Sequence, residues 1–145
     1  MALNWAKSGI NHVPSYQISG IPFVTASVNQ ELTSDSTSVK VSFPYVTSWV
    51  VIQCTGSAGA PGEASLKFGF SDLGVTNTAS PGSKNRYFVL NDGSRTERLE
   101  LRCKEIYLAR SGSTNAGFNI LAGLTTIEAG HMLSLTGSSE FAGIG

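Results

Sequence analysis

The histidines, cysteines and carboxylates are the side chains of this chain that could do chemistry, and their spacing matches no metal-binding pattern. His12 and His131 are the two histidines, and neither belongs to a His-x-His, His-Glu-x-x-His or Cys/His cluster. Cys54 and Cys103 are too far apart in the sequence for a zinc or thioredoxin motif. We therefore expect no metal ion and no cofactor. We interpret the cysteines as buried free thiols, with a disulfide as the alternative.

A nucleophilic or phosphate-binding motif is also missing from the sequence. The pattern Gly-x-Ser-x-Gly does not occur, and no glycine-rich stretch has the Walker spacing. Glycoside hydrolysis requires two carboxylates, and ten acidic residues are present. Those between residues 92 and 105 alternate with basic residues, as on a solvated face. We expect no catalytic residues and interpret the chain as a protein that is not an enzyme.

Basic residues are concentrated between positions 84 and 110, which hold seven of the ten lysines and arginines. One interpretation is a solvated sheet face or edge, where charge discourages edge pairing. The other is a docking face for an acidic protein surface. Its candidate residues are Arg86, Arg95, Arg98 and Arg102. The formal net charge is zero, which argues against a nucleic-acid partner held by electrostatic attraction.

The elements that position these residues are predicted to be strands. Charged residues make up 14% of the chain, against about 25% in an average domain, and this argues against coiled coils and helical bundles. Alternating or β-branched runs separated by loops at 55–63 and 72–84 predict strands at 37–43, 48–54, 64–71, 85–91, 117–127 and 132–136. The run at 48–54 is typical of a central strand buried on both faces. These segments predict an all-β fold, an antiparallel jelly-roll-like β-sandwich of about eight strands.

Residues 94–110 (SRTERLELRCKEIYLAR) are compatible with two structures. A helix would have a capping box at Ser94 and an i,i+4 pair from Glu100 to Lys104. Two strand segments would be separated by a one-residue bulge at Lys104–Glu105. We favour the strands, because the neighbouring segments are β and the aromatic and β-branched residues here prefer strands.

The first 36 residues differ from the remainder of the chain. Pro14 and Pro22 interrupt them, and the residue before a proline is biased toward extended geometry, so we expect Val13 and Ile21 to be extended. We therefore divide the chain into an extended N-terminal arm, 1–36, and a β-sandwich domain.

The sandwich domain is assigned to residues 37–145. The arm would be ordered on assembly with partners, or else held on its own sandwich by β-pairing. Deletion of residues 1–27 is expected to leave a folded sandwich that no longer assembles. The candidate contact residues of the arm are Trp5, His12, Tyr16, Ile18 and Phe23.

Two stretches resemble a known family. Asn11–Ser27 (NHVPSYQISGIPFVTAS) resembles the N-terminal motif of small structural proteins from tailed, especially marine, bacteriophages. Leu99–Thr126, with LELRCKEIYLAR followed by GFNILAGLTT, resembles their later motif, in which an AGLT-like turn leads into the last hairpin. The resemblance implies a single jelly-roll or related β-sandwich without catalysis, cofactor or metal.

By that resemblance, the chain would be a capsid decoration or cement protein that bridges capsid subunits. Its partners would be the major capsid protein or other virion proteins, and further copies of itself, plausibly as a trimer. The alternative is a tail-, vertex- or fibre-associated structural protein or a carbohydrate-binding module. No secretory signal or membrane-spanning run is visible in the sequence. We therefore expect synthesis in the host cytoplasm, location on the capsid surface, and no membrane or nucleic-acid partner.

Overall fold

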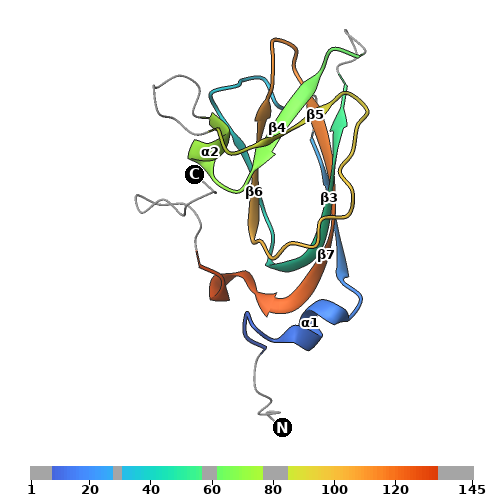
Figure 1. The fold of residues 1–145 in the computed structure, drawn as a ribbon, viewed down its shortest axis with the longest axis vertical. Helices are drawn as coiled ribbons and strands as arrows, with labels where there is room; N and C mark the ends of the chain where they lie inside the picture. Colours follow the sequence, from blue (N-terminus) through green and yellow to red (C-terminus); the bar gives the residue numbers. More distant parts are fainter. Residues whose placement is uncertain (1–7, 28–30, 57–61, 77–84, 134–145) are drawn as a thin grey trace.

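The protein is a two-layered antiparallel β-sandwich, as the sequence predicts (Figure 1). The computed structural model describes residues 8–27, 31–56, 62–76 and 85–133. Three strands form one sheet in the order β1-β7-β3, and four form the other in the order β2-β6-β4-β5. The strands are β1 (Ile21–Ala26), β2 (Val39–Ser42), β3 (Tyr45–Thr55), β4 (Ser65–Gly69), β5 (Phe88–Asn91), β6 (Glu105–Arg110) and β7 (Gly117–Glu128).

Three short helices complete the described part of the chain. They are α1 (Val13–Gln17), α2 (Asp72–Thr76) and the 3-10 helix η1 (Ala129–His131). Helix α1 lies at one end of the sandwich, and α2 lies beside β4 and β6 (Figure 1). These helices are too short to cross a lipid bilayer.

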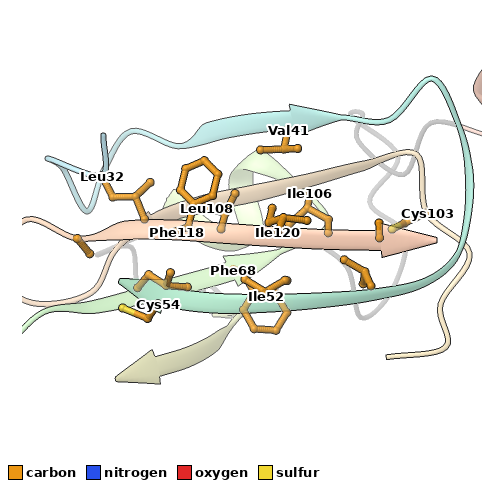
Figure 2. Close-up of a cluster of buried hydrophobic side chains, with 14 of the residues drawn as sticks. Leu32, Val41, Ile52, Cys54, Phe68, Cys103, Ile106, Leu108, Phe118 and Ile120 are labelled. Atoms are coloured by element: carbon orange, nitrogen blue, oxygen red, sulfur yellow. The ribbon is translucent and has the colours of Figure 1, made fainter. Parts of the chain in front are cut away.

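The core lies between the two sheets and is built by the period-two alternation of the strands. In β3, Val50, Ile52 and Cys54 are fully buried, whereas the residues between them are half-buried. Figure 2 shows Ile52 and Cys54 together with side chains from β2, β4, β6 and β7 in one apolar cluster. The prediction that the run at 48–54 is buried on both faces is therefore wrong, because only one face of β3 meets the core.

The N-terminal segment is part of the sandwich through β1. Strand β1 pairs along its whole length with β7, from Ile21 opposite Leu124 to Ala26 opposite Asn119. Further along, Leu32 is buried in the core and exchanges two backbone hydrogen bonds with Ala116. Of the two alternatives for the arm, the structure has the β-paired one.

Val13 is helical, so the prediction that it is extended is wrong. It begins α1, and Pro14 occupies the first turn. Proline is well tolerated there because its φ suits a helix and its missing N–H would lack an intrahelical partner anyway. The amide of Ile18 donates to the carbonyl of Pro14 at 3.2 Å and ends the helix.

Residues 94–110 contain one strand, β6, rather than two strands or a helix. The first half follows the free side of β3 with isolated bridges, Arg95 opposite Gln53 and Leu99 opposite Val50. The chain then passes from the three-stranded sheet to the four-stranded sheet before Glu105. The change of phase at Lys104–Glu105 marks this crossing between layers and not a bulge within one strand.

Three further predictions from the sequence need correction. Residues 72–84 were expected to be a loop, yet Asp72–Thr76 form α2, supported by the amide of Gly74 donating to Ser71 Oγ at 3.0 Å. The AGLT sequence, Ala122–Thr125, lies inside β7 and not in a turn, because its alternate side chains continue the core. Met132 and Leu133 are not in a strand, and the rest of the run at 132–136 lies outside the described residues.

Candidate functional site

The outer faces of the two sheets carry different side chains. On the four-stranded sheet, α2 and charged groups lie over the strands, including Lys40, whose ammonium lies 2.7 Å from a Glu105 carboxylate oxygen. On the three-stranded sheet, the outward positions of β1, β7 and β3 form rows of neighbours across the strands. We call this second surface the apolar face, and its described members are Pro22, Val24, Ala26, Trp49, Val51, Gln53, Asn119, Leu121 and Gly123.

The middle row of the apolar face is aliphatic and exposed. Val24 lies opposite Leu121, which lies opposite Val51 on its other side. Val24 is 72% exposed and Leu121 is 43% exposed, while Val51 is half-buried. Single exposed apolar residues are ordinary, but a contiguous exposed apolar group is less common on the surface of a monomeric protein.

The next row extends this surface with an aromatic ring. Pro22 and Trp49 both lie opposite Gly123. A side chain at Gly123 would collide with the indole of Trp49, so the glycine allows the ring to lie close to β7. The guanidinium of Arg98 lies 5.3 Å from the centre of the Trp49 ring, a cation–π contact that covers part of it.

The free side of β1 forms one edge of the three-stranded sheet. The amide of Ser27 donates to the carbonyl of Phe118, so alternation directs the N–H and C=O groups of Val24 and Ala26 away from β7. Pro22 shares that outward direction and has no N–H to offer, as is usual for a proline in an edge strand. The proline therefore restricts the addition of a further strand at this edge.

The predicted contact residues of the arm have different positions. His12 is exposed, with its Nδ1 2.6 Å from Ser15 Oγ, and Ile18 is exposed. Phe23 packs on the protein's own core, with its ring centre 5.1 Å from that of Phe43. Trp5 lies outside the described residues.

Tyr16 attaches α1 to the sandwich. Its hydroxyl donates to the carbonyl of Ile10 at 2.7 Å, and its own carbonyl accepts from Ser48 Oγ at 3.1 Å. Arg102 donates to the same Ile10 carbonyl and lies 5.6 Å from the Tyr16 ring centre. Tyr16, Ser48 and Arg102 also line a surface groove of about 440 Å³.

The predicted basic docking residues do not form one group. Arg95, Arg98 and Arg102 follow one another along the segment beside β3. Arg86 lies two residues before β5 of the other sheet, and its amide donates to the Gly74 carbonyl of α2. Arg98 and Arg102 also lie over aromatic rings of this same chain. The basic sequence segment is thus divided between the layers of the fold.

Two thiols lie in the hydrophobic core between the sheets. Cys54 and Cys103 are both buried and unpaired, so the interpretation as free thiols is confirmed. Burial raises the pKa of each thiol to about 11, and the negative charge of Asp92 adds to the effect at Cys54. Across the described ranges, no three His, Cys, Asp or Glu side chains gather as ligands for a metal ion would.

Comparison of the chain with protein-family models, with curated proteins and with solved structures finds no match. The class defined by the fold is therefore a small antiparallel β-sandwich with an exposed apolar sheet face. Sequence reasoning missed this face. The alternation of β1 could have indicated Val24, but Leu121 lies in a nearly continuous apolar run in which the exposed positions are not distinguishable from the buried ones.

Proposed function

We propose that this chain is a non-enzymatic structural protein of a bacteriophage particle, most specifically a capsid decoration protein that bridges capsid subunits. The proposal combines the family resemblance of Asn11–Ser27 and Leu99–Thr126 with the apolar face of the three-stranded sheet. The apolar face is the observation that carries it, because an exposed aliphatic and aromatic sheet surface suits permanent contact with protein better than contact with solvent.

The N-terminal segment supports the same proposal. Helix α1 lies at the end of the sandwich and presents Val13 and Ile18 to solvent, at 60% and 69% exposure. Helix α1 lies close in the sequence to the apolar face, since the chain runs from α1 through Gly20 directly into β1. In the proposed assembly, Val13 and Ile18 provide a second exposed apolar group for contact with a neighbouring subunit.

Self-association is part of the proposal. The chain has a formal net charge of zero and few charged residues, so electrostatic repulsion between copies is weak. We propose a homo-oligomer, plausibly a trimer, whose contacts with the major capsid protein resist outward pressure on the shell. In this mechanism the protein acts by adhesion and carries out no reaction.

The alternative position in the particle is a tail, vertex or fibre. Stoichiometry separates the two, because a shell is covered by many symmetry-related copies whereas a tail or vertex has few. Quantitative mass spectrometry of purified particles should give hundreds of copies for a decoration protein. A small copy number would move the proposal to the tail or vertex, and absence of the chain from purified particles would refute it.

The deletion of residues 1–27 is not a clean test of the arm. It removes β1 and the Phe23 side chain that packs on the core, so loss of assembly could follow from loss of the fold. Single substitutions on the apolar face separate these effects, since exposed side chains contribute little to the stability of the isolated chain.

A further inference from the structure

A lysine is buried on the outer side of the four-stranded sheet without an acidic partner in contact. Lys67 lies in β4, between Val89 of β5 and Ala109 of β6, and is 5% exposed. Among the described residues, its ammonium has no hydrogen bond or ion pair. It lies 5.1 Å from the centre of the Tyr87 ring. Buried lysines are rare unless they are paired, so this position needs a physical reason.

The lysine lines a surface pocket of about 250 Å³ whose other walls are largely polar. The lining residues are Asp35, Lys67, Asn85, Tyr87, Arg110, Ser111 and Gly112. Arg110 is held at the pocket by hydrogen bonds from its Nη1 to the Ser113 carbonyl, at 3.0 Å, and to Asn115 Oδ1, at 3.3 Å. Its Nε is buried and, within the described part of the chain, has no hydrogen-bond partner.

The charges of the pocket favour an anion. Two cationic side chains face one carboxylate, Asp35, which is exposed and therefore screened by water. Burial lowers the pKa of the Lys67 ammonium, although the negative charge of Asp35 partly offsets this. An anion bound beside Lys67 would add to the charge of Asp35, the one carboxylate among the described lining residues.

We propose that the Lys67 pocket binds a carboxylate, with the ammonium of Lys67 as its main charged partner and Arg110 and Asn85 as neighbouring donors. A sugar is a poorer occupant, because carbohydrate recognition uses the open face of an aromatic ring and Lys67 already lies over Tyr87. The carboxylate could belong to a free small acid or to a Glu side chain of another protein, and both present the same charged group. The inference depends on this pocket and not on the apolar face or the proposed function.

The test is an NMR titration of the isotope-labelled full chain with succinate, at constant ionic strength maintained with chloride. Succinate should cause saturable shifts of the Ser111 and Gly112 amide signals. The substitution Lys67→Met should raise the dissociation constant at least tenfold, equal to about 1.4 kcal/mol. Lys67→Arg should retain binding, because it keeps the charge at this position. A second titration with N-acetyl-glutamate amide, which mimics a Glu side chain in a protein, identifies the source of the carboxylate.

Lys40→Met is the matched control. Lys40 is in the same sheet and lies 5.8 Å from the Tyr107 ring centre, but it is exposed and forms an ion pair with Glu105. The Lys40→Met variant should bind succinate with the same affinity as the unaltered chain. A spectrum of Lys67→Met with the signal dispersion of the unaltered chain would show that this variant is folded. Non-saturable shifts with both probes, or equal affinity in Lys67→Met, would overturn the proposal. Binding of succinate but not of N-acetyl-glutamate amide would identify the ligand as a free small acid. Binding of both probes would show that the pocket also accepts the carboxylate of a Glu side chain.

Discussion

The indole of Trp49 occupies the space that a side chain at position 123 would need. A Cβ built on Gly123 would collide with Nε1 and Cε2 of Trp49. Gly123 is in the central strand of its sheet, between β1 and β3. The position of the Trp49 indole over β7 therefore depends on a residue with no side chain.

Gly123→Ala should destabilise the protein by about 1–3 kcal/mol, because the added methyl group forces the indole or the strand to move. Urea unfolding followed by fluorescence measures the change. Gly130→Ala is the control, since nothing lies within 4 Å of a Cβ at that position. An alanine at 123 that unfolds at the same urea concentration as the control would contradict the close packing.

Thr47 fixes the segment that crosses between the sheets. Its buried Oγ1 donates to the Leu101 carbonyl at 2.6 Å and accepts from the Cys103 amide at 3.0 Å, beside an irregular stretch of the β3–β7 pairing. Thr47→Val would leave both backbone groups without this partner. We expect a loss of about 1–3 kcal/mol in the free energy of unfolding.

Thr126→Val is the matched control for that prediction, because Thr126 is exposed in β7. Its effect should stay within about 0.5 kcal/mol. Thermal or denaturant unfolding of both variants provides the comparison. Equal stabilities of the two would show that the Thr47 hydroxyl does not hold residues 101–103.

Val24→Lys should abolish self-association while leaving the chain folded, because it places a charge in the middle of the apolar face. Size-exclusion chromatography with light scattering measures the mass of the assembly, and circular dichroism verifies the fold. Val89→Lys is the control: this valine is 46% exposed in β5, an edge strand of the opposite sheet. Loss of the oligomer in both variants, or in neither, would argue against the apolar face as the contact.

The two thiols should make the protein less stable in alkaline solution. Their pKa is raised from 9.0 to about 11 in the folded chain, so the unfolded chain ionises first. Their contribution to stability is complete below pH 9 and is lost as the pH rises toward 11. Replacing both cysteines with alanine should reduce the slope of unfolding free energy against pH in this range. An unchanged slope would show that other groups cause the loss of stability.

The strands could be predicted where one face is buried and the other solvated. Val41 and Phe43 are buried while Lys40 and Ser42 are exposed, and this alternation gives the local structure without knowledge of any partner. The turn at Asp92–Gly93 could also be predicted from the local sequence, because Gly93 has a φ of 72°, which glycine adopts without strain. The sequence does not predict helix α1, because a proline disfavours helix at the preceding residue and also suits the first turn of a helix, and the sequence alone does not decide between these effects.

The chain's own alternation and turn residues thus determined the all-β class and the positions of most strands, whereas the unpaired state of the thiols was decided by the tertiary structure. Tertiary structure alone decided that β1 closes one edge of the sheet, that Arg86 is separated from the other arginines, and that Lys67 lies in a pocket with Arg110. The physical reason is the distance along the sequence between the residues that interact. Alternation depends on neighbours two residues apart, whereas pairing, sheet order and the meeting of charges depend on segments brought together from distant parts of the sequence.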